Sequence, residues 1–249
     1  MLLFCLLLVL PAPIPVFADS RFDVWTADNG LPQNSVYSII QSHDGYIWFT
    51  TFGGLVRYDG VRFTVFDKAN APGIPSSRFT AIYEDGDGAI WVGSYDGGLN
   101  RFKDGHFTSY NMSNGLFDNS VFQILEDAQG NFWMSCNRGI YRVSQAELNE
   151  FAEGRRSSVT SIYYGKRDGL LNTECNGGAQ PAGFRSRDGR LWFPTQDGMA
   201  VVDPSSVQRS TTPPPVAIEE FTIGSNDVFF RERPRYRRAR NSSAFTTRA

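Results

Sequence analysis

Three aspartates are the residues of this chain whose spacing most invites a chemical role. Asp44, Asp87 and Asp188 each precede a glycine in similar surroundings, so they could serve as carboxylates in acid–base catalysis or bind calcium. A tight turn between strands favours the same residue pair, because the aspartate side chain bonds to the turn backbone. The acidic stretch 84–88 lacks the later ligands of a calcium loop. We therefore interpret these aspartates as turn residues and predict no catalytic or metal-binding residue.

Histidine and cysteine add little further chemistry. His43 and His106 stand beside turns without a partner pattern, and we interpret both as solvated surface residues. Cys136 and Cys175 could pair in an oxidising compartment, but two buried free thiols are the favoured interpretation, since cysteine often packs as a small hydrophobic residue. No cofactor is expected.

An internal repeat must position any functional residue. Its clearest marks are four tryptophans, 43, 42 and 59 residues apart: Trp48, Trp91, Trp133 and Trp192. The third interval is long because a polar stretch, 144–158, is inserted there, for which a loop or a short helix is expected. We expect the tryptophans to pack between sheets and not to form a sugar-stacking platform.

Asp-Gly turns divide each repeat into strands. In the second repeat the expected strands are 78–84, 89–95, 98–103 and 106–110. In the fourth repeat they are roughly 182–187, 190–195 and 199–203. Three hairpin turns in about 43 residues predict a four-stranded meander, the size of a propeller blade. The predicted fold is therefore all-β, a β-propeller of four-stranded antiparallel blades with four repeats visible.

The repeats resemble the two-component regulator propeller repeats of bacterial sensor proteins. The resemblance is carried by Asp44-Gly45-Tyr46-Ile47-Trp48 with Gly54-Leu55 after it, and by the equivalent stretches 82–102, 121–142 and 187–199. It continues into 213–218, which is similar to the first strand of the Ig-like domain that follows the propeller in that family. It implies a sensor whose kinase or cyclase output domain and membrane span lie outside this chain, so the chain itself is expected not to be an enzyme.

The expected organisation follows from these signals. It comprises a signal peptide (1–18), propeller repeats (19–208) with blades at 33–67, 76–111, 118–166 and 176–204, a linker with the start of an Ig-like domain (209–230), and a basic, disordered tail (231–249). Residues 21–26 precede Asn29-Gly30-Leu31 as 107–110 precede Asn114-Gly115-Leu116. They are therefore predicted to complete the fourth blade as its outer strand and to close a small ring.

The net charge and the predicted signal peptide limit the possible partners and the location of the protein. Residues 231–249 hold seven Arg and one Glu, so residues 1–230 carry a charge of −8, which argues against nucleic acid. The apolar run 2–10 before Ala18 predicts export, so the chain is expected in the periplasm. The resemblance implies a small-molecule or oligosaccharide ligand and contact with the membrane only through a downstream span. Whether the full receptor forms a homodimer is left open.

Candidate ligand-binding residues lie in the loops that lead into the first strand of each blade, because such loops gather at one face around the central opening. They are Gln33, Asn34, Ser77, Arg78, Asp118, Asn119, Asn172 and Asn176.

Two other function classes remain open. An exported propeller enzyme acting on polysaccharide, a lyase or a glycoside hydrolase, needs two carboxylates that converge at non-repeat positions. A scaffold that binds proteins across a blade face does not need such a pair of carboxylates. The acidic residues here mostly occupy repeated turns, which counts against the enzyme.

Overall fold

The computed structural model describes residues 22–207, 220–223 and 226–229. The chain divides into two units, residues 1–204 and 205–249, and each is described by itself. The predicted signal peptide, the 213–218 strand and the basic tail lie outside the described residues, and these three interpretations stay predictions.

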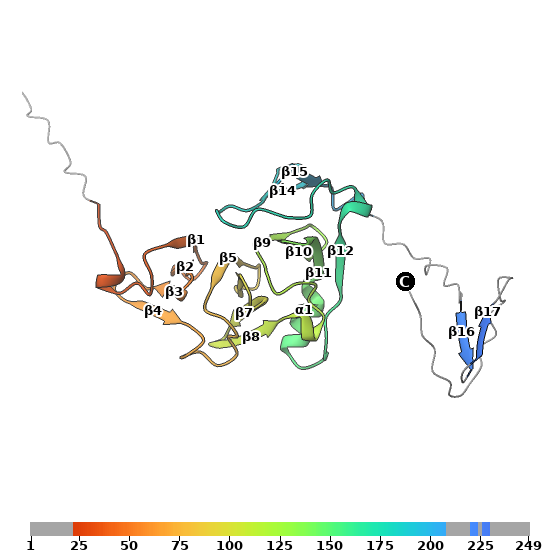
Figure 1. Cartoon of the computed structure of the whole chain (residues 1–249). Coiled ribbons are helices and arrows are strands. Elements are labelled where there is room, and N and C mark those ends of the chain that lie inside the picture. Colours follow the sequence, from red (N-terminus) through yellow and green to blue (C-terminus); the bar gives the residue numbers. More distant parts are fainter. Residues whose placement is uncertain (1–21, 208–219, 224–225, 230–249) are drawn as a thin grey trace, which may run out of the picture. The chain divides into compact units, whose positions relative to one another are not determined.

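The first unit is built from antiparallel sheets that follow one another along the chain (Figure 1). The first sheet contains β1 (Val36–Gln41), β2 (Ile47–Thr51), β3 (Gly54–Tyr58) and β4 (Phe63–Phe66). The second contains β5 (Phe79–Glu84), β6 (Ile90–Ser94), β7 (Leu99–Lys103) and β8 (His106–Tyr110). The third contains β9 (Gln123–Glu126), β10 (Asn131–Cys136), β11 (Gly139–Ser144) and β12 (Ser161–Tyr164). The fourth contains β13 (Phe184–Arg185), β14 (Leu191–Thr195) and β15 (Gly198–Val202).

This order confirms the predicted all-β propeller fold with four repeats. Each strand pairs with the next along the chain, and the inner strands β1, β5 and β9 lie side by side. The Asp104-Gly105 turn shows why the sequence folds this way: both residues have positive φ, 51° and 79°, as a two-residue hairpin turn requires. At Asp96-Gly97 the positive φ falls on the following residue, Gly98, instead.

Three of the four repeat tryptophans form the core of the sheets, as predicted, whereas Trp192 is only partly buried. Trp48, Trp91 and Trp133 are at most 2% exposed. Trp48 contacts Phe102 of the second sheet at 5.3 Å between ring centroids, and Trp91 contacts Phe132 of the third at 4.9 Å. Because each ring reaches the next sheet, these contacts join the blades.

Within its own sheet each of these tryptophans also stacks on an aromatic ring of the outer strand. The stacked pairs are Trp48–Phe66 (5.9 Å), Trp91–Tyr110 (5.9 Å) and Trp133–Tyr164 (5.0 Å). An arginine from the third strand lies over the same indole at 5.4–5.7 Å; the three are Arg57, Arg101 and Arg142. The repeat therefore encodes an arginine–tryptophan–aromatic stack in each four-stranded sheet.

The inserted polar stretch forms a short helix, α1 (Gln145–Ala152), between β11 and β12. Leu148 of the helix is fully buried, and its carbonyl accepts a hydrogen bond from the Tyr110 hydroxyl at 2.8 Å. Gln145 donates from Nε2 to the Asp85 carboxylate at 2.9 Å. The insertion therefore ties the third sheet to the second.

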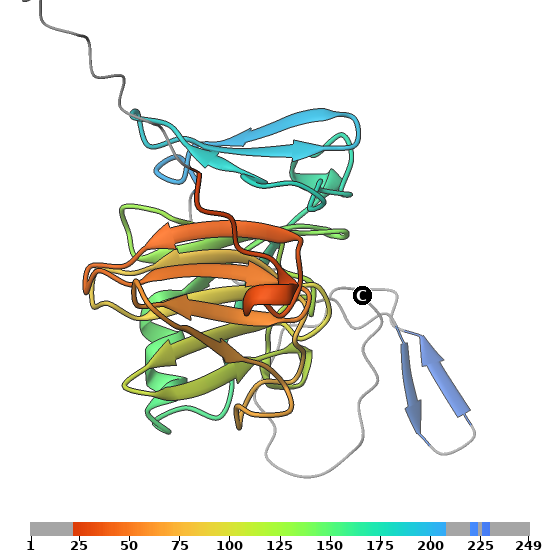
Figure 2. The same cartoon turned by 90° about the vertical axis from the view of Figure 1, so that its left-hand side faces the viewer.

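The fourth sheet corrects one prediction. Its order is β13-β14-β15, and residues 22–26 form neither a strand nor part of this sheet. Trp25 instead packs on Tyr58 and Phe63 of the first sheet, with ring centroids 5.5 and 6.1 Å away. Figure 2 shows this segment against the first sheet, in orange. The interpretation of 21–26 as the outer strand of the fourth blade is wrong for this structure, because the aromatic edge of the first sheet holds Trp25.

The second unit contains one described hairpin, β16 (Glu220–Ile223) paired antiparallel with β17 (Asn226–Phe229). The Ig-like interpretation of this region stays a prediction. Among the described residues, no helix is long and apolar enough to cross a membrane.

Candidate functional site

The loops that lead into the first strand of each sheet lie beside the turn between its second and third strands. Gln33 accepts a hydrogen bond at Oε1 from the backbone N–H of Phe52 at 3.0 Å. The corresponding side-chain pairs in the later sheets are Ser76 with Asp96, Asp118 with Arg138 (3.5 Å), and Asn172 with Asp197 (2.9 Å). We call this end of the sheets the loop face. The predicted residues Gln33, Asp118 and Asn172 thus clamp each loop to its turn.

A second repeated position fixes the same loops from within. Asn34 Oδ1 accepts from the Ala27 N–H at 2.6 Å, and Asn119 Oδ1 accepts from the Met112 N–H at 2.9 Å. Ser77 Oγ accepts from the Lys68 N–H at 3.0 Å. Asn176, three residues beyond this position in the fourth repeat, donates from Nδ2 to the Thr195 carbonyl at 3.1 Å. These four predicted residues therefore hold backbone, and a role for them in ligand binding stays a prediction.

Arg78 is an exposed predicted residue that lies against aromatic rings. Its guanidinium lies 4.8 Å from the ring centroid of Phe52 and 4.3 Å from that of Tyr95. Tyr37 stacks on Phe52 at 4.3 Å, and Phe52 meets Tyr95 at 5.9 Å. We call Tyr37, Phe52 and Tyr95 the aromatic row. Phe122 of the lead-in to β9 extends it at 6.0 Å from Tyr95. The row thus crosses from the first sheet to the third.

Local sequence explains this arrangement. Arg78 occupies the repeat position where the first and third repeats have Ser35 and Ser120. Phe52 and Tyr95 each follow the repeat tryptophan by four residues, at the start of the turn. Sequence reasoning missed both rings because it treated the aromatic residues as core. Their shared place in the turn, outside the apolar strand run, was the signal that could have found them.

The electrostatics of the row leave Arg78 available. Its partner is Asp96, at 3.4 Å, and the two side chains are 44% and 48% exposed. A pair this exposed is screened by water and contributes at most about 1 kcal/mol. Tyr95 is 41% exposed. An open ring face beside a guanidinium and a carboxylate can stack on a flat apolar ring and bond to polar groups at its edge.

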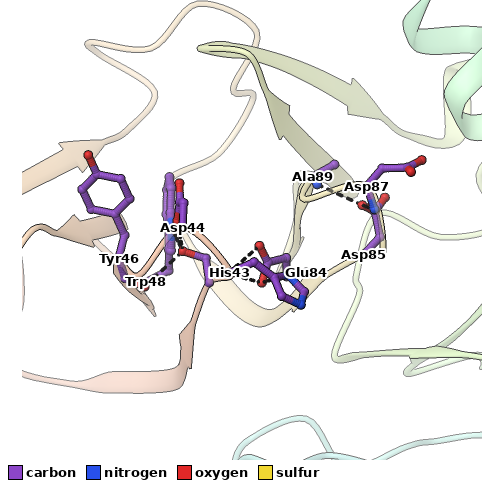
Figure 3. A network of polar contacts seen from close by, with 9 residues as sticks. His43, Asp44, Tyr46, Trp48, Glu84, Asp85, Asp87 and Ala89 are labelled. Carbon is purple, nitrogen blue, oxygen red and sulfur yellow. Dashed lines mark hydrogen bonds and ion pairs between the residues drawn. The ribbon is translucent and has the colours of Figure 1, made fainter.

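The opposite face of the sheets carries a polar network between the first and second sheets (Figure 3). The His43 backbone N–H donates to both carboxylate oxygens of Glu84 at 3.0 Å, and His43 Nδ1 lies 3.0 Å from Oε2. The His43 side chain is 79% exposed, as the solvated interpretation predicted, yet it has this partner. A hollow of about 320 Å³ next to the network is lined by Asp44, Arg57 and Lys103 among others.

The carboxylates at this opposite face hold turns. Asp85 is 1% exposed and accepts hydrogen bonds from the N–H groups of Asp87 and Ala89, at 3.0 and 2.9 Å, and from Trp91 Nε1 at 2.7 Å. Asp44 and Asp188 accept from the hydroxyls of serines two residues earlier. The interpretation of these last two aspartates as turn residues is confirmed.

The two remaining cysteines lie together as buried free thiols, as favoured from the sequence. Cys136 Sγ lies 3.4 Å and Cys175 Sγ 3.7 Å from the Gly139 carbonyl oxygen. Burial raises the pKa of Cys136 to about 12 and that of Cys175 to about 11, so both stay protonated at neutral pH.

The sheets and their tryptophan stacks define the chain as a β-propeller protein. Residues 30–53, 73–96 and 115–138 match the two component regulator propeller repeat. This confirms the family resemblance seen in the sequence. The fourth repeat, around Trp192, was expected from the same motif and lies outside the matched ranges.

Relatives of known structure share the fold. The extracellular domain of the hybrid two component system BT3049 from B. thetaiotaomicron superposes with a TM-score of 0.65 at 22% identity, covering 81% of this chain and 26% of that chain. The extracellular domain of BT4673 from the same organism gives a TM-score of 0.56 at 21% identity, covering 69% of this chain and 24% of that one. At these identities the likeness concerns the fold.

One curated relative, histidine kinase P4 of Formosa agariphila, is 28% identical over 251 aligned residues. The match covers 79% of this chain but only 17% of the kinase. The chain therefore spans a small part of the length of its relatives.

Proposed function

We propose that this chain is an extracytoplasmic, non-catalytic ligand-sensing module of a bacterial signal-transduction receptor. Its ligand is a small molecule or an oligosaccharide that binds at the loop face, over the aromatic row and beside Arg78. The observation that carries the proposal is the guanidinium 4.3 Å from the Tyr95 ring, with both groups open to solvent.

The family and its relatives support the signalling part. The matched repeats are those of two component regulators, and the relatives include a histidine kinase and extracellular domains of two component systems. A periplasmic location agrees with those names and with the predicted leader. The kinase activity belongs to that relative, and the output domain of this receptor is expected beyond residues 1–249.

The surroundings of the buried carboxylates support a binding role over catalysis. A catalytic carboxylate must reach substrate, whereas Asp85 and Asp127 are 1% and 3% exposed. Trp133 Nε1 donates to Asp127 at 2.7 Å, just as Trp91 does to Asp85. Both groups therefore act as acceptors that hold indoles and turns.

A binding assay on the purified chain tests the proposal. The chain is incubated with a panel of plant and bacterial oligosaccharides, binding is measured by calorimetry, and the sugars are recovered for chromatography. We expect one or more to bind and to be recovered intact. Tyr95→Ala should weaken binding about fivefold, because a stacked ring contributes on the order of 1 kcal/mol.

Matched variants show whether the loop face is responsible. Arg78→Ala should weaken the same ligand, whereas Arg62→Ala, an exposed arginine between β3 and β4, should leave affinity unchanged. Reproducible turnover of any sugar would contradict the non-catalytic role. Equal effects of the two arginine variants would contradict the location of the site.

A further inference from the structure

The outer strands of the three complete sheets meet the third strand in one register. Phe66 stands opposite Leu55, Tyr110 opposite Leu99, and Tyr164 opposite Ile140. In each sheet the outer-strand residue of this pair is the one that stacks on the tryptophan. The strand register therefore determines where the stacking ring lies. The same register in the fourth sheet assigns a stacking residue to the position opposite Met199, because Met199 follows the turn glycine of β15 as Leu55 follows that of β3.

The fourth sheet has room for such a strand. Within the described part of the chain, β15 pairs only with β14 and forms the edge of the sheet. Met199 is 71% and Val201 43% exposed. A cavity of about 270 Å³ separates β15 from the third sheet, and its lining includes Trp133, Tyr164 and residues 199–202. An open apolar edge of this kind readily pairs with another strand.

Residues 22–25 have the sequence of an outer strand. Phe22-Asp23-Val24-Trp25 matches Phe63-Thr64-Val65-Phe66 in its pattern. Trp25 stands five residues before Gly30, as Tyr110 stands before Gly115 and Tyr164 before Gly169. In the structure this segment pairs with no strand, and Phe22 and Val24 are 93% and 69% exposed.

We propose that residues 22–25 of a second copy of this chain add to β15 as its fourth strand. The register places Trp25 opposite Met199, Val24 opposite Ala200, and Asp23 opposite Val201. On strand addition, Trp25 of the second copy leaves Tyr58 and Phe63 of its own first sheet and stacks on Trp192, as Tyr110 stacks on Trp91. Strand addition gives the free N–H and C=O groups of the edge their partners.

Phe22 of the second copy fits the cavity. Phe107 of the second sheet occupies the position equivalent to Phe22, and its ring packs on Phe66 of the first sheet at 5.5 Å between centroids. The residue equivalent to Phe66 in the third sheet is Tyr164, which lines the cavity next to β15. The cavity therefore lies where the first aromatic residue of an added strand belongs.

A second copy is favoured over the chain's own segment because that segment is fixed elsewhere. The Thr26 carbonyl accepts from Leu31 N–H at 3.2 Å, and Ala27 N–H donates to Asn34, so the segment is anchored to the first lead-in loop. In Figure 1 this end lies beside β4, whereas β14 and β15 lie above β9 and β10. The segment and the edge are different surfaces, so copies join head to tail.

Complementation of two surface variants tests the proposal. Phe22→Asp removes the donor strand and Met199→Asp the acceptor edge; both side chains are mostly exposed, so each variant should fold. By light scattering we expect the full chain to gain mass with concentration and each variant to stay monomeric. A mixture of the two variants should form a dimer that grows no further, because each variant keeps one intact surface.

Cysteine cross-linking tests the register. Val24→Cys mixed with Ala200→Cys should give a covalent dimer on oxidation, whereas Val24→Cys mixed with Val201→Cys should not, since neighbouring strand residues face opposite sides. Several outcomes would overturn the proposal: a full chain that stays monomeric at all concentrations, a mixture that fails to dimerise, or the double variant Val24→Cys with Ala200→Cys cross-linking within one chain.

Discussion

The two middle sheets hold their tryptophans differently from the two outer ones. In the second and third sheets a buried aspartate, Asp85 or Asp127, accepts the indole N–H directly at 2.7 Å. In the first and fourth sheets a serine does so, Ser42 at 3.1 Å and Ser186 at 3.0 Å. Each serine then donates to an aspartate two residues later. One repeat position therefore has two chemical solutions.

The buried aspartates of the middle sheets depend on the donors around them. A buried carboxylate is stable only when several donors surround it. Asp85 has four, two turn N–H groups, an indole and the Gln145 amide. A serine hydroxyl is neutral and costs less to remove from water than a carboxylate, and Ser42 is only 5% exposed. The comparison teaches that in the middle sheets a carboxylate accepts the indole N–H itself, whereas in the outer sheets a neutral hydroxyl lies between the indole and the carboxylate.

The largest expected effect comes from the buried carboxylate. Asp85→Ala leaves an indole, an amide and two backbone N–H groups without their acceptor, so the free energy of unfolding should fall by about 3 kcal/mol. Ser42→Ala should cost about 1 kcal/mol. Urea unfolding of both variants checks the difference. Equal losses would break the distinction between middle and outer sheets.

Removing the indole donor should show the same contrast between middle and outer sheets as removing its acceptor. Trp91→Phe removes one donor from a fully buried carboxylate and should lower the free energy of unfolding by about 2 kcal/mol. Trp192→Phe removes a donor from Ser186 in a sheet with no outer strand among the described residues, and should cost less than about 1 kcal/mol. Thermal unfolding measures both. A larger loss for Trp192→Phe would reverse the comparison.

The tie from α1 should have a smaller effect. Gln145→Ala removes one of the donors to Asp85 and should lower the free energy of unfolding by about 1 kcal/mol. In an Asp85→Ala background the same change should cost almost nothing, because the bond is already gone. A double-mutant cycle measures this coupling. A full additional loss in that background would show that Gln145 acts through other contacts.

The smallest effect concerns acid. The hydrogen bond from Ser186, and then those from Arg190, lower the pKa of Asp188 from 3.8 to about 2. A carboxyl whose pKa is lowered on folding stabilises the fold above the unfolded value of 3.8, and this stabilisation is lost as pH falls through about 2. An NMR titration should find that low midpoint, and Ser186→Ala should move it toward 3.8. An unchanged midpoint would contradict the role of the serine.

Sequence reasoning predicted the strands well because their signals are local. The Asp104-Gly105 turn and the run around Trp91 mark adjacent strands, and the observed β8 has the predicted bounds. The pairing of residues 21–26 was wrong because it depends on a partner far away in the chain. Nothing in Trp25 itself distinguishes the edge of the first sheet from that of the fourth.

The candidate site was predicted in part. The loops do gather with the turns at one face, but Asn34 and Asn119 turned out to hold backbone, a use that composition does not reveal. Arg78 was named correctly as a loop residue, while its neighbours Phe52 and Tyr95 were missed. An aromatic residue in a turn looks like core until the direction of its ring is known.

In the three four-stranded sheets the stack around the tryptophan is contained within one sheet. Trp91 finds its acceptor six residues earlier and its aromatic partner nineteen residues later, at Asp85 and Tyr110. In the third sheet α1 is inserted between Trp133 and Tyr164, and the two rings still stack at 5.0 Å. A gene that duplicates or loses one such segment therefore gains or loses a finished piece of protein, so evolution can change the number of blades without rewriting the blades that remain.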